Sequence, residues 1–135
     1  MNQSLRVLHV EDDFADAMLL QQALCDAGGY DLELEVVRTL SDAKRKLARR
    51  HYDLMIIDLR LPDSIDPADT VRTAEKIANG TPFLILTGSA RVDAETLGAH
   101  LNILDKNEFF NGKDRTASFR LLRKVQDAAE DTLHL

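Results

Sequence analysis

The sequence is poor in several residue types, and each shortage excludes a class of protein. Cys25 is the only cysteine, so no disulfide can form within the chain, and a reducing compartment is expected. We interpret this thiol as half-buried in a helix. No apolar run approaches the roughly 20 residues that cross a bilayer, and the segment from Met1 to Ser4 has no signal-peptide pattern. These absences predict a cytoplasmic protein with no membrane contact.

Trp is absent, aromatic residues make up only 5% of the chain, and basic residues are outnumbered by acidic ones, 17 to 23. The resulting net charge of -6 disfavours direct binding to nucleic acid or to an anionic membrane. A basic run at 44–50 is therefore interpreted as the solvated face of a helix. At 135 residues the chain has room for one core, and we expect a single domain over residues 1–135.

Five short apolar segments have the pattern of β-strands, at 5–10, 31–37, 52–59, 82–87 and 101–104. The third is almost continuously apolar and is expected to be central. The second alternates apolar with acidic residues, which predicts one wetter face. His9 interrupts the first strand, and we interpret it as a hydrogen-bonded core residue without a functional role.

Helical patterns separate the strands. The first covers 14–27 and stops at Gly28, and the last starts between residues 113 and 118, runs to the chain end and buries Phe119. The other helices have expected N-caps, which are Thr39 or Ser41, Asp66 followed by Pro67, and Ser89. This alternation predicts an α/β fold with a doubly wound, five-stranded parallel sheet of strand order 2-1-3-4-5.

Five polar residues lie at the carboxyl ends of these strands: Glu11, Asp12, Asp58, Thr87 and Lys106. Such ends meet along one edge of a parallel sheet, where these folds build their sites. In this strand order, the residues that follow the first and third strands face each other across the point where the chain reverses direction. We therefore expect Asp12 and Asp58 to be close neighbours.

Crowded carboxylates repel one another unless a cation joins them, which favours a hard divalent ion, Mg²⁺ or alternatively Mn²⁺. We predict metal ligands from Glu11 or Asp13, from Asp12, from Asp58 and from the backbone carbonyl of Arg60. Asp58 follows the most apolar strand and suits a nucleophile that forms an aspartyl phosphate. Lys106 and Thr87 would then neutralise two of the phosphoryl oxygens.

Each of these residues also has a simpler explanation when taken alone. Acidic runs are mostly solvated loop charge, Thr87 fits a helix cap, and Lys106 fits a surface lysine. Their joint placement at four separate strand ends favours the functional interpretation.

Four segments resemble the response regulator receiver domains of two-component signalling: VLHVEDD (7–13), DLMIIDLRLPD (53–63), LILTG (84–88) and DK (105–106). The first two together are a specific signal, and the resemblance covers nearly the whole chain. It implies a flavodoxin-like fold, with Asp58 as phosphoacceptor and Asp12 and Glu11 as Mg²⁺ ligands. It also implies that Thr87 senses the phosphoryl group and that Lys106 pairs with it.

By the same resemblance, Arg60 and Ser89 would adjust the rate of hydrolysis. The implied partners are a sensor histidine kinase or a histidine phosphotransfer protein, together with a downstream protein target. The implied activities are self-phosphorylation and self-dephosphorylation, in a phosphoacceptor rather than an enzyme with a separate substrate. We expect a stand-alone receiver that acts by protein contact or as a phosphate sink.

Three departures from the family pattern stand out. Asn107 follows Lys106 where the family usually has proline, so we expect a trans bond and a different loop shape. Ile103 takes the place of the usual aromatic switch residue, and the stretch from Thr87 to Lys106 is a few residues short. The Phe109-Phe110 pair is expected in the core rather than in an interface.

Two other functions are compatible with these residues. The departures near Lys106 motivate the first, a receiver-like adaptor that binds its partner without phosphorylation. The second is a magnesium phosphatase with an aspartyl nucleophile. That class resembles the haloacid dehalogenases, which place a second acid two residues after the nucleophile, and here Arg60 occupies that position.

Overall fold

The protein folds around one five-stranded parallel sheet. The computed structural model describes residues 4–28, 31–98, 101–112, 114 and 116–130. The strands are β1 (Ser4–Val10), β2 (Asp31–Val37), β3 (Leu54–Ile57), β4 (Phe83–Thr87) and β5 (Ile103–Asp105). They lie in the order β2-β1-β3-β4-β5 and all pair in parallel. The predicted fold class and strand order are confirmed.

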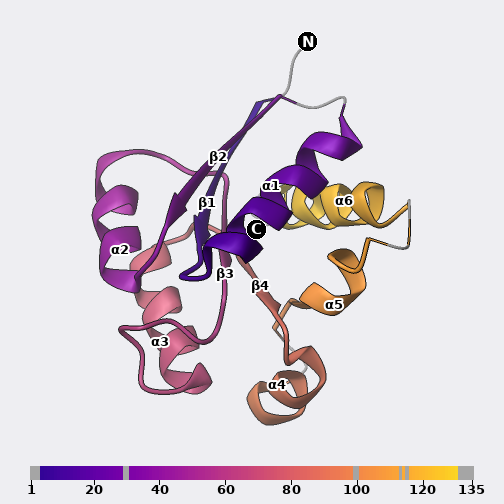
Figure 1. Ribbon diagram of the computed structural model, residues 1–135. Coiled ribbons are helices and arrows are strands. Elements are labelled where there is room, and N and C mark those ends of the chain that lie inside the picture. The colour runs from indigo at the N-terminus through magenta and orange to yellow at the C-terminus, as the bar shows by residue number, and fades with distance from the viewer. Residues whose placement is uncertain (1–3, 29–30, 99–100, 113, 115, 131–135) are drawn as a thin grey trace.

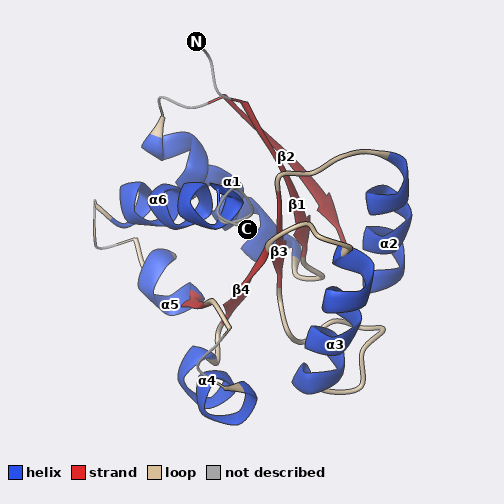
Figure 2. Cartoon of the chain, turned by 180° about the vertical axis from the view of Figure 1, so that it is seen from behind, coloured by secondary structure: helices blue, strands red, loops and turns tan. Residues whose placement is uncertain are grey.

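Helices cover both faces of the sheet. Figures 1 and 2, which view the molecule from opposite sides, place α1 (Phe14–Ala27) and α6 (Ala117–Glu130) on one face. The other face carries α2 (Leu40–Arg49) and α3 (Pro67–Ala78), while α4 (Ala90–Leu97) and α5 (Lys106–Phe109) lie beyond β4. Two apolar clusters, one on each side of the sheet, form the core. Among the described residues, no helix is long and apolar enough to cross a membrane.

The helix starts follow the predicted capping pattern with one exception. The Thr39 hydroxyl accepts the backbone N–H of Asp42 at the start of α2, and Asp66 caps α3 with Pro67 in its first turn. α1 has the predicted bounds and ends at Gly28, whose φ of 63° lies in the left-handed region that glycine tolerates. Ser89 occupies the N-cap position of α4, but its side chain makes no capping hydrogen bond.

The strands β3 and β5 are shorter than predicted or shifted along the chain. β3 ends at Ile57 rather than Leu59, although the backbone N–H of Asp58 still donates to the Val10 carbonyl of β1. Before β3, Asp53 bonds to Arg6 twice: its carboxylate accepts the backbone N–H of Arg6 at 2.8 Å, and its own backbone N–H donates to the Arg6 carbonyl at 2.8 Å. β5 starts two residues later than predicted and pairs Asp105 with Thr87. Both strand ends therefore still meet at the expected edge.

Three predictions about single side chains are wrong. Phe119 is 60% exposed rather than buried, because it lies about 200° around α6 from the buried Ala117. Cys25 is exposed rather than half-buried. His9 is buried as predicted, but neither of its ring nitrogens has a hydrogen-bond partner among the described residues.

The region after β5 combines confirmed and missed features. The bond between Lys106 and Asn107 is trans, as predicted. One turn of helix, α5, starts at Lys106, which the sequence did not predict. The Asp105 carboxylate caps this turn by accepting the N–H of Asn107 at 2.9 Å. Phe109 is buried and Phe110 packs against the same cluster, which confirms the core assignment.

Candidate functional site

The carboxyl ends of β1 and β3 bring the predicted acids to one edge of the sheet. Val10 is paired with Ile57 across the two strands, and the backbone N–H of Asp58 donates to the carbonyl of Val10 at 3.0 Å. The N–H of Glu11 donates in turn to the carbonyl of Val37 on β2, at 2.9 Å. Backbone pairing therefore fixes where the side chains of Glu11 and Asp58 begin.

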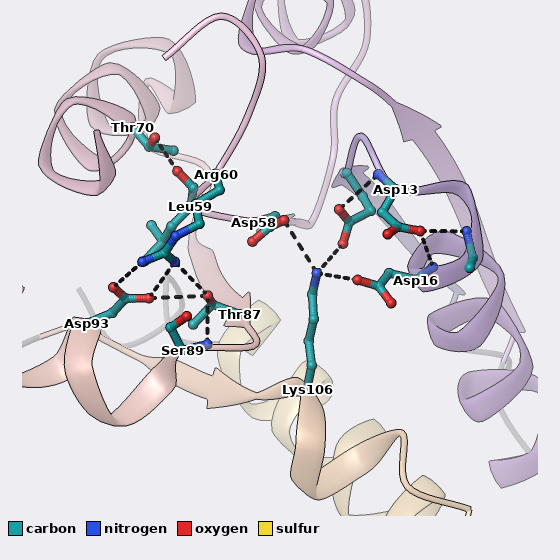
Figure 3. A network of polar contacts seen from close by, with 12 residues as sticks. Asp13, Asp16, Asp58, Leu59, Arg60, Thr70, Thr87, Ser89, Asp93 and Lys106 are labelled. Carbon is teal, nitrogen blue, oxygen red and sulfur yellow. Dashed lines mark hydrogen bonds and ion pairs between the residues drawn. The ribbon is translucent and has the colours of Figure 1, made fainter. Parts of the chain in front are cut away.

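Lys106 joins three carboxylates from three elements (Figure 3). Its Nζ lies 2.7 Å from Glu11 Oε1, 2.7 Å from Asp16 Oδ2 and 3.4 Å from Asp58 Oδ2. The Lys106 side chain is 11% exposed and that of Asp58 14%, so the cluster is shielded but still open to a small ligand. One ammonium facing three carboxylates leaves a local excess of negative charge, which favours a further cation.

The electrostatics of the cluster follow from this arrangement. Burial alone would lower the pKa of Lys106, but the nearby carboxylates of Asp16, Glu11 and Asp58 raise it on balance. Burial raises the pKa of Glu11 to about 7, and the ion pair with Lys106 only partly opposes that shift. The lysine therefore stays protonated at neutral pH, while Glu11 is poised to gain or lose a proton.

Asp12 and Asp13 have contacts of their own. The carboxylate of Asp12 lies 3.1 Å from the Arg38 guanidinium, at an exposed position. Asp13 caps α1 by accepting the N–H groups of Ala15 and Asp16. Asp12 and Asp58 thus follow neighbouring strands, as predicted, but each is paired with a different cation. Among the described residues, no three His, Cys, Asp or Glu side chains are grouped closely enough to hold a metal ion.

A second polar network surrounds Thr87 (Figure 3). Its hydroxyl donates to Asp93 Oδ2 at 3.2 Å and accepts the backbone N–H of Ser89 at 3.3 Å. The Arg60 guanidinium makes two contacts with the Asp93 carboxylate, at 3.1 and 3.3 Å, and one with Thr87 Oγ1, at 3.5 Å. Asp93 and Thr87 are both buried. The hydroxyl that was predicted to face a phosphoryl group is therefore already held by α4.

Sequence analysis missed two members of these networks, Asp16 and Asp93. Both lie in the first turn of a helix that follows a site-bearing strand. Acids are common at that position because they favour the helix dipole. The available signal was their spacing: Asp16 lies three residues after Asp13, and Asp93 lies four after Ser89. Only the folded structure shows that they point into the site.

The match to a family of known proteins covers most of the chain. The family model described as the response regulator receiver domain matches residues 7–106. This chain belongs to the response regulator receiver family. The match includes all five polar residues predicted at the strand ends.

Curated relatives agree with this assignment. The receiver domain is 34% identical over 93 residues to the swarming motility regulation protein RssB of Serratia marcescens. The aligned stretch covers 67% of this chain and 39% of that protein. The cell cycle transcriptional regulator CtrA of Caulobacter vibrioides has the same identity, over 38% of its length. The autoinducer 2 sensor kinase/phosphatase LuxQ of Vibrio vulnificus is 33% identical over 89 residues, 10% of its length. The receiver thus matches only a part of each relative.

Solved structures have the same fold as this receiver. A sensor protein from Polaromonas has a TM-score of 0.72 at 23% identity, and 95% of this chain and 98% of that chain are aligned. The receiver domain of a Pseudomonas aeruginosa sensor histidine kinase, with a magnesium ion coordinated in its active site cleft, has a TM-score of 0.69 at 21% identity, over 94% and 98%. The receiver domain of a putative Luxo repressor protein from Vibrio parahaemolyticus has a TM-score of 0.68 at 26% identity, over 96% and 93%.

Proposed function

We propose that this receiver accepts a phosphoryl group on Asp58 from a sensor histidine kinase or a histidine phosphotransfer protein. Receiver domains as a family interact with such proteins. The observation that carries the proposal is the placement of the Asp58 carboxylate, which is 3.4 Å from the buried ammonium of Lys106 at the carboxyl edge of the sheet. The receiver would then signal by protein contact or act as a phosphate sink, in the cytoplasm.

The residues present suit this transfer chemically. An Asp58 oxygen attacks the phosphorus of a phosphohistidine, the P–N bond breaks, and its electron pair stays on the imidazole nitrogen, which takes up a proton. The Lys106 ammonium contacts an oxygen of Asp58. It would pair with the negative charge that develops on the oxygens of the transferred phosphoryl group. We propose a phosphoacceptor with slow self-dephosphorylation rather than an enzyme that acts on a separate substrate.

The chemistry of the donor set fits Mg²⁺. Glu11, Asp12, Asp58 and the carbonyl of Arg60 offer only hard oxygen ligands, and an octahedral ion that keeps several waters needs just a few of them. The carboxylates around Lys106 exceed its charge, as described above. Bound there, Mg²⁺ would neutralise charge on the phosphoryl oxygens.

Phosphodonor labelling of wild type and Asp58→Asn tests the proposal. We expect wild-type protein incubated with Mg²⁺ and acetyl phosphate to gain about 80 Da, one phosphoryl group, in an intact-mass measurement. The Asp58→Asn variant keeps the shape of the side chain but lacks the nucleophilic carboxylate, so it should gain none. Glu75→Gln, which removes an exposed acid from α3, is the control and should gain the same mass as wild type. An unlabelled wild type, or a labelled Asp58→Asn variant, contradicts the proposal.

Removing Arg38 should strengthen Mg²⁺ binding. Its guanidinium pairs with Asp12, and a metal bound by Asp12 would have to compete with that exposed pair, which is worth at most about 1 kcal/mol. We expect Arg38→Ala to tighten Mg²⁺ binding about threefold in a calorimetric titration. Arg72→Ala, which removes an exposed arginine from α3, should leave the affinity unchanged. A weaker or equal affinity in Arg38→Ala would show that Asp12 is not a ligand.

A receiver-like adaptor is the second candidate function. The specific observation in its favour is that each proposed acidic ligand has a cationic partner within the protein: Lys106 contacts Glu11 and Asp58, and Arg38 contacts Asp12. The same titration separates the two functions. Mg²⁺ binding that Asp12→Asn weakens supports the phosphoacceptor, and no detectable Mg²⁺ binding supports the adaptor.

A further inference from the structure

We propose that Asp93 is a positioning residue that holds the Thr87 hydroxyl away from the phosphoryl site until Asp58 is phosphorylated. This inference rests on the proposed function and adds a regulatory element to the same site. Asp93 belongs to α4, in the part of the chain that differs from the usual receiver pattern. We call the contacts among Arg60, Asp93 and Thr87 the α4 latch.

The hydroxyl of Thr87 is fully engaged in hydrogen bonds. A hydroxyl has one proton to donate and two lone pairs to accept with. The Thr87 hydroxyl donates a hydrogen bond to Asp93 Oδ2 at 3.2 Å. Its oxygen accepts hydrogen bonds from the backbone N–H of Ser89 at 3.3 Å and from Arg60 Nη1 at 3.5 Å. All positions are filled, so Thr87 can donate to a phosphoryl oxygen only after its bond to Asp93 breaks.

Asp93 is a buried carboxylate that depends on two partners, Arg60 and Thr87. Its side chain is only 4% exposed, and a buried carboxylate needs compensating partners. Arg60 supplies two contacts, at 3.1 and 3.3 Å, and Thr87 supplies the other contact. The Arg60 side chain is itself half exposed and follows Asp58 by two residues. A phosphoryl group on Asp58 would therefore attract both partners of Asp93 at once.

The same contacts connect Thr87 to α4. The hydrogen bond between Thr87 and Asp93 ties the end of β4 to the first turn of this helix, and the N-cap residue Ser89 provides no side-chain cap. When the Thr87 hydroxyl donates its hydrogen bond to a phosphoryl oxygen instead of Asp93, the first turn keeps Arg60 as its only charged contact in the latch. The α4 latch thus links phosphorylation of Asp58 to the position of α4. This link needs no aromatic switch residue, and position 103, where the family usually has one, is isoleucine.

The test is a double-mutant cycle on the binding of beryllofluoride, a phosphoryl mimic, to the full chain in the presence of Mg²⁺. Because the latch opposes binding, Asp93→Ala should bind about tenfold more tightly than wild type, the value of one hydrogen bond to a charged group. Asp93→Asn, which keeps an uncharged acceptor and guards against misfolding, should bind about twofold more tightly. In a Thr87→Val background, without the hydroxyl, the gain from Asp93→Ala should fall at least threefold.

Glu95→Ala, which removes an exposed acid from the same helix, is the control and should bind like wild type. A purely structural role of Asp93 would give the same change in both backgrounds, so equal gains overturn the inference. Unchanged or weaker binding in both Asp93 variants overturns it as well. In those cases wild-type labelling at Asp58 leaves the proposed function standing, whereas failure of wild type to bind the mimic or gain mass overturns both.

Discussion

Replacing Lys106 with methionine is expected to destabilise the domain by about 3 kcal/mol in metal-free solution. The ammonium is the shared partner of Glu11, Asp16 and Asp58. Methionine fills a similar volume but leaves three carboxylates facing each other without a cation. Breaking a buried ion pair by removing one partner costs more than the pair contributes, because the remaining charge stays uncompensated. Urea denaturation at neutral pH in the presence of a chelator measures the loss.

Magnesium should restore part of the stability lost in Lys106→Met. A divalent ion that binds only the folded state stabilises it more the more tightly it binds, and the variant offers the ion a more negative site. We expect Mg²⁺ to raise the stability of Lys106→Met more than that of wild type. Lys124→Met, at an exposed position of α6, is the matched control and should change stability little. A Lys106→Met variant as stable as wild type would contradict the assigned role of Lys106 in the cluster.

The fold could be predicted because its signals are local and agree with one another. Continuous apolar segments such as 54–57, together with caps such as Asp66 with Pro67, mark alternating strands and helices. Side-chain facing within a helix was harder to predict. Phe119 was assigned to the core by its helical spacing from Leu122, whereas α6 buries the small residue Ala117 and leaves Phe119 exposed. Small residues give a weak periodic signal, so the orientation of that helix had to come from packing.

The site could be predicted only in part, for a related reason. Strand topology fixes where Asp58, Thr87 and Lys106 emerge, and the sequence was sufficient to place these three at one edge. The sequence did not show which residue each of these side chains would contact. Asp12 pairs with Arg38, and Thr87 pairs with Asp93. These partners could not be predicted, because they depend on distances between side chains in the folded structure, which residue spacing in the sequence does not give. Asp16 and Asp93 were missed for the same reason.

Acid is expected to destabilise the protein strongly through His9. This histidine is 1% exposed, and neither ring nitrogen has a hydrogen-bond partner among the described residues. Burial, with a contribution from Lys106, lowers its pKa from 6.5 to about 3. Below pH 6.5 the unfolded chain therefore takes up a proton that the folded protein does not. This contribution to stability is complete above pH 6.5 and is lost as the pH falls towards 3.

The expected loss is about 1.4 kcal/mol per pH unit, or about 3 kcal/mol between pH 6.5 and pH 4. Replacing His9 with leucine removes the titrating group and suits a strand whose neighbours are apolar. We expect His9→Leu to unfold at a higher urea concentration than wild type at pH 4, with a smaller difference at pH 7.5. His51→Gln, at an exposed position, should keep the acid sensitivity of wild type. Equal acid sensitivity in His9→Leu would contradict this role of His9 and assign the acid loss to the other groups that gain protons between pH 7.5 and pH 4.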